Sequence, residues 1–123
     1  MKSYTDLEQS KKLAEFLPLE SADYHYIAQG EKSYHYSYSL SNDAIEQYNG
    51  DIKYIPCWSL SALLDVLPDE VGDNHYLTLD KEGKEYCCCY EDCNGNSSLH
   101  VFASNPIDAC VEMILKLKEK NLI

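Results

Sequence analysis

Cysteines are the residues of this chain that are most able to do chemistry, and six of them occur among its 123 residues. Cys88, Cys93 and a following histidine, His100, could supply three ligands to zinc, which prefers thiolate and imidazole donors. They form no CxxC pair, and the sequence offers no obvious fourth ligand, so the pattern is weaker than a usual zinc signature. The alternative is that Cys88 and His100 are an ordinary polar pair between neighbouring strands.

A catalytic role is not favoured. A nucleophile pair of Cys88 and His100 would need a third group to orient the imidazole and a site for an oxyanion, and neither is visible. No HExxH, GxSxG, P-loop or GxGxxG pattern occurs. We therefore predict no catalytic residue and no cofactor. The other thiols are expected to be small buried hydrophobic groups, as free cysteines often are; these include Cys57, Cys87, Cys89 and Cys110.

The charge of the chain is strongly acidic, with a net charge of −11 and no arginine among its ten basic residues. Proteins that bind nucleic acid need cationic side chains, arginine above all, so a nucleic-acid partner is not expected. Acidic residues are dense between positions 42 and 73. They form either a solvated surface or a face that meets a basic partner or mimics nucleic acid, with Asp65, Asp69, Glu70 and Asp73 as candidate partner-binding residues.

Three strands are predicted in the C-terminal half, over residues 75–80, 84–90 and 97–103. Both connecting loops fit a type I turn followed by a left-handed glycine. This loop type places Leu77 opposite Cys87, and Cys89 opposite Leu99. One face would then be aliphatic and thiol-bearing, with Leu77, Leu79, Cys87, Cys89, Leu99 and Val101.

The other face of these strands would be aromatic and would also carry Cys88 and His100. Its aromatic members are Tyr76, Tyr86, Tyr90 and Phe102. A face of this kind is either covered by another element or exposed to a protein partner or a second copy of the chain. The four aromatic residues are therefore candidate partner-binding residues.

Helices are predicted over residues 5–16, 56–68 and 105–120, each with a capping residue at its start. A tyrosine-rich segment that alternates with period two, residues 24–40, indicates a β-hairpin. We expect one α+β domain over residues 1–123. Its antiparallel sheet would combine the C-terminal three-strand meander with the Tyr-rich hairpin and would be packed on one face by two or three helices.

The start of the chain lacks the apolar segment of a signal peptide, and no apolar run approaches the roughly 18 residues of a membrane span. The expected location is the cytoplasm, where a disulfide framework would be unusual.

Four motifs carry a resemblance to known proteins. They are EQSKKL at residues 8–13, SAD at 21–23, PCWSLSALL at 56–64 and NPIDACVEM at 105–113. In this order they resemble a group of small uncharacterised proteins encoded by phages and prophages of gut bacteria. The resemblance implies a cytoplasmic, mobile-element setting and transfers no functional residue.

The function expected from the sequence is protein interaction without catalysis, as in an accessory protein of a phage or mobile element, through an acidic or aromatic surface. A protein partner or self-association is expected, and neither a nucleic acid nor a membrane. The alternative is a small metal- or thiol-dependent enzyme that uses Cys88, Cys93 and His100.

Overall fold

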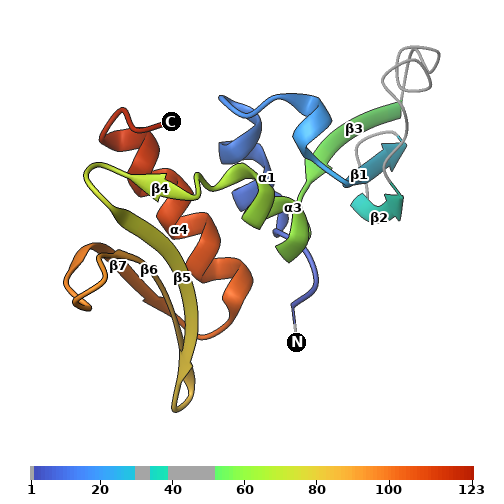
Figure 1. Ribbon diagram of the computed structural model, residues 1–123. Coiled ribbons are helices and arrows are strands. Elements are labelled where there is room, and N and C mark those ends of the chain that lie inside the picture. The colour runs from blue at the N-terminus through green and yellow to red at the C-terminus, as the bar shows by residue number, and fades with distance from the viewer. Residues whose placement is uncertain (1, 30–33, 39–51) are drawn as a thin grey trace. The chain divides into compact units, whose positions relative to one another are not determined.

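The structure is a computed structural model that describes residues 2–29, 34–38 and 52–123 (Figure 1). These residues form α-helices and two antiparallel sheets, which confirms the predicted α+β class. They divide into two compact units. The N-terminal unit is Tyr4–Ala62, and the C-terminal unit joins Met1–Ser3 to Leu63–Ile123, with the division inside helix α3 (Leu60–Val66).

The N-terminal unit holds a three-stranded sheet with the order β2-β1-β3. The predicted Tyr-rich hairpin is present, but it does not extend the C-terminal sheet as expected. Its partner is instead a strand that the sequence analysis missed, because the short apolar run after position 51 was not recognised as β-forming. The elements are α1 (Leu7–Ala14), the 3-10 turn η1 (Leu19–Ser21), β1 (Tyr24–Gln29), β2 (Tyr34–Tyr38) and β3 (Ile52–Cys57).

Helix α1 begins one residue later than its predicted cap. Asp6, and not Thr5, accepts a hydrogen bond from the backbone N–H of Gln9, whose side chain returns one to the backbone N–H of Asp6. Thr5 is fully buried. Its hydroxyl accepts the N–H of Trp58 at 3.1 Å and lies 2.7 Å from the hydroxyl of Ser10. Thr5 therefore ties the chain before α1 to the segment that leads into α3.

The start of α3 is fixed by side chains of the N-terminal unit. Ser59 caps the helix, as predicted, by accepting the N–H of Ala62 at 3.2 Å. The carboxylate of Asp23 accepts hydrogen bonds from both the backbone N–H and the hydroxyl of Ser59. Trp58 is fully buried, and its indole N–H donates to the hydroxyl of Ser21 at 3.0 Å. The only tryptophan of the chain is thus a reporter of the N-terminal unit.

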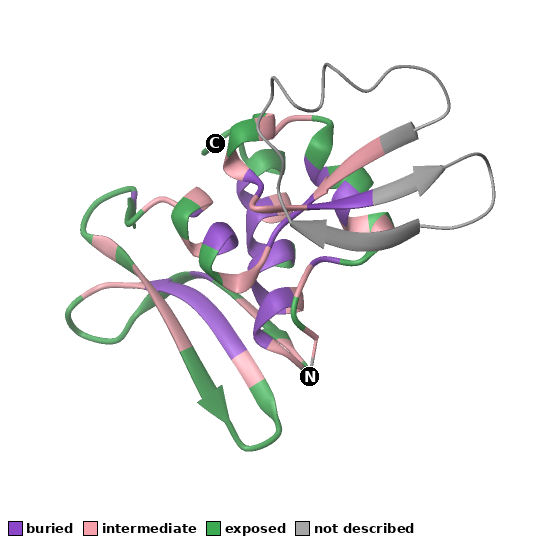
Figure 2. Cartoon of the chain, turned by 90° about the vertical axis from the view of Figure 1, so that its right-hand side faces the viewer, coloured by how far each residue is buried: buried purple, intermediate pink, exposed green. Residues whose placement is uncertain are grey.

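The C-terminal unit is a four-stranded antiparallel sheet with the order β4-β5-β6-β7, packed on one face by α4 (Figure 1). Its elements are β4 (Glu70–Val71), β5 (His75–Glu82), β6 (Glu85–Glu91), β7 (Ser97–Ala103) and α4 (Pro106–Glu119). Buried residues line one side of α4 and the middle of β6 (Figure 2). The core between helix and sheet is built from Tyr90, Leu99, Ile107, Cys110, Val111, Ile114 and Leu117.

Helix α4 has the predicted cap. Asn105 accepts the N–H of Asp108 at 2.9 Å, and Pro106 occupies the first turn. The Asp108 carboxylate accepts a hydrogen bond from the side-chain amide of Asn105 at 2.7 Å through one oxygen, and its other oxygen forms a 2.8 Å ion pair with Lys2. This pair attaches the residues before Tyr4 to the C-terminal unit.

The hairpin between β5 and β6 has a shorter loop than predicted. The sequence predicts a loop over residues 81–83, whereas the structure pairs Glu82 with Glu85 and leaves only Gly83 and Lys84 in the turn. Gly83 has a φ of +62°. A two-residue hairpin turn needs a positive φ at its first residue, which glycine adopts readily. Gly83 is therefore compatible with this shorter turn as well as with the predicted three-residue loop.

The hairpin between β6 and β7 has the predicted loop. The N–H of Asp92 donates to the carbonyl of Asn96 at 3.0 Å, and Gly95 has a φ of +82°. The Asp92 carboxylate also accepts the backbone N–H groups of Asn96 and Asn94, both at 2.9 Å. These hydrogen bonds lower the pKa of Asp92, because they favour its charged form.

A β-bulge follows this loop and was not predicted. Glu91 pairs with Ser97, but Tyr90 pairs with Leu99, so Ser98 is an extra residue in β7. Every earlier residue of β6 therefore has a partner one position further along β7 than the sequence analysis assumed.

The shorter β5–β6 turn and the β-bulge each exchange the two faces of β6 relative to the prediction. Leu77 faces Tyr90, three positions beyond its predicted partner Cys87, and Cys89 faces His100. A shift by an odd number of residues exchanges the two faces of a strand. The even-numbered residues of β6 therefore face α4, and the odd-numbered ones point away from it.

Buried His25 makes the N-terminal unit sensitive to acid. Its ring is 1% exposed, and neither ring nitrogen has a hydrogen-bond partner among the described residues. Burial lowers the pKa of His25 below its ordinary 6.5, because the charged form is poorly solvated there. The unfolded chain takes up the proton first, so this part of the stability is present above pH 6.5 and is lost as the pH falls toward the folded pKa.

We predict that the free energy of unfolding, followed by Trp58 fluorescence in urea, falls between pH 7 and pH 5 by up to about 1.4 kcal/mol per pH unit. The variant His25→Leu should have a flatter pH profile, whereas His75→Gln, in the C-terminal unit, should keep the wild-type profile. Parallel profiles for wild type and His25→Leu would contradict the assignment.

Candidate functional site

The face of the C-terminal sheet that points away from α4 is the candidate functional site, and we call it the open face. Strand pairing and alternation assign its members, because paired residues of neighbouring strands share a face. Most of them also line a shallow groove of about 310 Å³. The open face consists of Glu70, Tyr76, Thr78, Asp80, Glu82, Glu85, Cys87, Cys89, Glu91, Ser97, His100 and Phe102.

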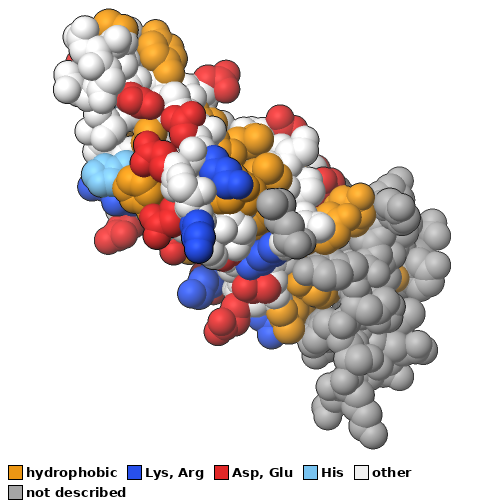
Figure 3. Space-filling model, turned by 90° about the horizontal axis from the view of Figure 1, so that it is seen from below, with side chains coloured by type: hydrophobic (Ala, Val, Ile, Leu, Met, Phe, Trp, Pro, Cys, Tyr) orange, Lys and Arg blue, Asp and Glu red, His pale blue; other side chains and the backbone are white. Residues whose placement is uncertain are grey.

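Aromatic and acidic side chains occur together on the open face. Tyr76 and Phe102 are 49% and 46% exposed, which is unusual for such large apolar groups. His100 is also exposed, and its ring lies edge-on to that of Phe102 with centroids 6.0 Å apart. Five members of the face are carboxylates and none is a lysine. On the surface shown in Figure 3, acidic side chains likewise stand directly beside hydrophobic ones.

Two thiols form the floor of the groove. Cys87 and Cys89 are 8% and 6% exposed, and both line the groove. The Cys89 thiol also lies 2.9 Å from the hydroxyl of Thr78 and donates to the Glu91 carboxylate at 3.5 Å. Burial raises the pKa of Cys87, and it raises that of Cys89 to about 12. Both groups are therefore neutral thiols near pH 7.

The third adjacent thiol, Cys88, has the opposite orientation. It is fully buried against α4, where it forms a hydrogen bond with the thiol of Cys110. That hydrogen bond, together with burial, raises the pKa of Cys88. Beside it, Tyr90 donates its hydroxyl to the carbonyl of Pro68 at 2.7 Å. The thiol pair joins β6 to α4, and the tyrosine hydroxyl joins β6 to the segment before β4; Cys88, Tyr90 and Cys110 are fully buried.

The predicted zinc ligands are not brought together. Cys88 lies on the inner face, His100 on the open face, and Cys93 is exposed in the loop between β6 and β7. The expected pair of Cys88 and His100 was wrong, because the β-bulge places Cys89 opposite His100 instead. In the part of the chain that the structure describes, no three His, Cys, Asp or Glu side chains are arranged to hold a metal ion.

The predicted partner-binding aromatic residues are divided between the two faces. Tyr76 and Phe102 lie on the open face as expected. Tyr90 is completely buried against α4, and Tyr86 is half-buried on the same inner side, where Lys81 lies 5.7 Å from its ring centroid. Tyr86 and Tyr90 lie on the inner side because the observed register exchanges the two faces of β6 relative to the prediction.

The predicted acidic residues are all exposed, and strand pairing assigns one of them to the open face. Glu70 is paired with Tyr76 and so belongs to the open face. Asp65 is on α3, Asp69 follows that helix, and Asp73 is in the turn before β5. The carboxylates Asp80, Glu82 and Glu91 were missed, although the alternation of polar and leucine residues along β5 was a signal for two of them.

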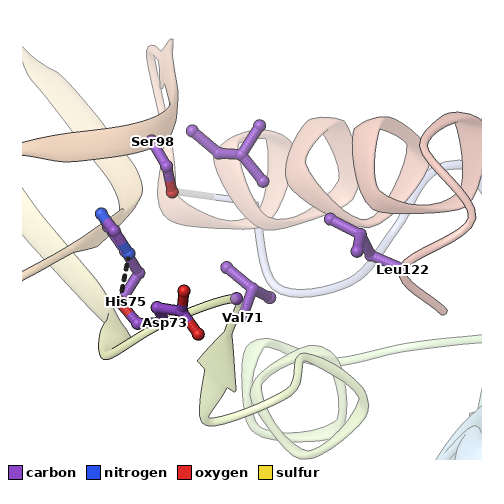
Figure 4. A pocket seen from close by; sticks show the side chains of 7 residues that line it. Val71, Asp73, His75, Ser98 and Leu122 are labelled. Carbon is purple, nitrogen blue, oxygen red and sulfur yellow. Dashed lines mark hydrogen bonds between the residues drawn. The ribbon is translucent and has the colours of Figure 1, made fainter.

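A second cavity, of about 370 Å³, lies on the inner side of the sheet near the end of the chain (Figure 4). Val71, Leu99 and Leu122 provide apolar walls, and Asp73 and His75 stand at one side. The Nδ1 atom of His75 lies 2.9 Å from the carbonyl oxygen of Asp73, so the ring is held by the turn rather than aimed at a ligand. We therefore regard the open face as the stronger candidate.

Comparisons of the chain with known protein families, with curated proteins and with solved structures found no match. Among the described residues, no helix combines the length and the apolar character needed to cross a membrane.

The placement of the thiols predicts an order of alkylation. In the native protein, iodoacetamide should modify exposed Cys93 first and Cys87 and Cys89 more slowly, while Cys88 should react only after unfolding. The rate at Cys89 should still be rising at pH 10, because its raised pKa keeps most of the thiol protonated there. Peptide mass spectrometry would give the order, and modification of Cys88 before Cys89 would contradict the observed faces.

Proposed function

We propose that this protein is a non-enzymatic interaction protein whose open face binds a lysine- or arginine-bearing segment of a partner protein. The observation that carries the proposal is a sheet with one face covered by α4 and the other presenting exposed Tyr76 and Phe102 among carboxylates. Exposed aromatic groups of this size, rimmed by polar residues, are typical of protein-binding surfaces.

Charge complementarity defines the chemistry of the partner. The carboxylates of Glu70, Asp80, Glu82 and Glu91 lie on a face without lysine, in a chain with a net charge of −11. Such a field attracts cationic groups and speeds their association, in a manner that salt weakens. It also opposes the approach of a second copy through the same face, so a basic partner is favoured over self-association through this surface.

The aromatic rings add contact that charge alone does not provide. Lysine and arginine side chains bring apolar stems as well as charge, and they bind over the faces of aromatic rings. Tyr76 belongs to β5 and Phe102 to β7, so the two rings lie on strands either side of β6. A partner segment that contacts both would cross the thiol-lined groove between them.

The alternative of a small thiol- or metal-dependent enzyme has no geometric support, since Cys88, Cys93 and His100 lie in three different environments. We place the interaction in the cytoplasm, where free thiols such as Cys87 and Cys89 remain reduced. A mobile-element origin and the absence of a nucleic-acid partner also belong to this proposal, the latter supported by the acidic charge.

Selection from an unbiased library of random displayed peptides tests the charge requirement. We expect the protein to enrich peptides rich in Lys and Arg, and we expect their binding to weaken as salt is raised. The double variant Asp80→Lys/Glu82→Lys should lose this enrichment, because it reverses two exposed charges of the open face.

The matched control is Glu112→Lys/Glu119→Lys, which makes the same change in net charge at exposed positions of α4. It should retain the wild-type peptide preference. Enrichment of acidic or neutral peptides by the wild type, or equal losses in both double variants, would refute a charge-specific open face.

Truncation of an aromatic ring tests the apolar contribution. Phe102→Ala should weaken binding of a selected peptide by about tenfold, which corresponds to about 1.4 kcal/mol. Leu122→Ala is a suitable control, because Leu122 is equally exposed, at 46%, but lies outside the open face. Fluorescence anisotropy with the labelled peptide would measure both, and equal effects would argue against a role for the ring.

A further inference from the structure

The two thiols at the floor of the groove have an arrangement that partner binding does not explain. Cys87 and Cys89 are two residues apart on β6, so alternation directs both to the same face, about 6.6 Å apart along the strand. Both side chains line the groove and are 8% and 6% exposed. Cys88 points to the opposite side, so the groove receives two sulfur atoms from this strand.

We propose that Cys87 and Cys89 form a two-sulfur binding site for a soft, thiophilic metal ion, with Cu(I) as the cellular ion of this class. Soft cations prefer sulfur donors, and a monovalent d¹⁰ ion is satisfied by two of them. A two-ligand site is compatible with the absence of any three-residue metal cluster among the described residues. The site goes beyond the proposed partner interaction and does not depend on it.

Neighbouring groups fit this chemistry. The groove is open to solvent on the side of the exposed residues Asp80, Glu82 and His100, which gives an ion a route to the thiols. Carboxylates around the groove raise the local concentration of cations. Glu91 already accepts a hydrogen bond from the Cys89 thiol at 3.5 Å and is the first acceptor for its proton.

Binding is an exchange of protons for metal and involves no oxidation. The S–H bonds of Cys87 and Cys89 break, two metal–sulfur bonds form, and two protons leave, the one from Cys89 through Glu91 to water. The metal remains in the +1 state. Affinity should therefore rise with pH, and each bound ion should release two protons.

The experiment uses the reduced full-length protein without air and titrates it with Cu(I) buffered by the chelator bathocuproine disulfonate. We expect one tightly bound ion per chain, counted by native mass spectrometry. Cys87→Ser and Cys89→Ser should each weaken binding at least tenfold, whereas Cys93→Ser, at an exposed position, should bind as the wild type does. Equal affinity in all three variants, or loss only in Cys93→Ser, would overturn the site.

A second measurement on the wild type avoids any dependence on whether the variants fold. One equivalent of Cu(I) should protect Cys87 and Cys89 from alkylation and leave Cys93 reactive, as read by peptide mass spectrometry. Unchanged alkylation of Cys87 and Cys89 in the presence of the ion would equally overturn the proposal. Peptide binding by the open face can persist or fail in either case, so the two proposals are tested separately.

Discussion

The register of β6 is the constraint on which the rest of the C-terminal unit depends. A two-residue turn at Gly83 and Lys84 sets its pairing with β5, and the bulge at Ser98 sets its pairing with β7. Together they direct Cys88 and Tyr90 into the core against α4. A register that differed by one residue would bury the carboxylate of Glu91 in their place, at a cost of several kcal/mol for an unpaired charge.

The same register explains why the side chains on one side of β6 pack against α4 and those on the other side line the groove. On the inner side, thiol and hydroxyl groups find partners within the core, as Cys88 does with Cys110 and Tyr90 with Pro68. On the outer side, Cys89 has polar partners in Thr78 and Glu91 beside an open groove. Polar groups at the groove are thus held in place by one another rather than by the core.

Much of the fold could be predicted from the sequence, because local signals were sufficient for it. Asn105 and Ser59 cap their helices as expected, and the loop from Asp92 to Asn96 has the predicted form. These features depend on residues a few positions apart. The strands of the C-terminal meander were also recognised, since alternation is a property of each strand alone.

The candidate site could not be predicted in the same way, because it depends on how strands pair. Glycine at position 83 is compatible with two hairpin loops that differ in length, and both have good precedent. The sequence contains no clear signal for the bulge, since either Ser97 or Ser98 could be the extra residue. The wrong turn length and the missed bulge each shifted the predicted pairing of β6 by an odd number of positions. The prediction therefore placed Tyr86 and Tyr90 on the open side of the sheet, where the structure has Cys87 and Cys89.

Interstrand backbone contacts measured by NMR are the most direct test of this register. The observed pairing predicts nuclear Overhauser contacts that link Cys89 to Thr78 on one side and to His100 on the other. Contacts from Cys89 to Leu99 instead would place Cys88 on the outer side and would contradict the open face as described.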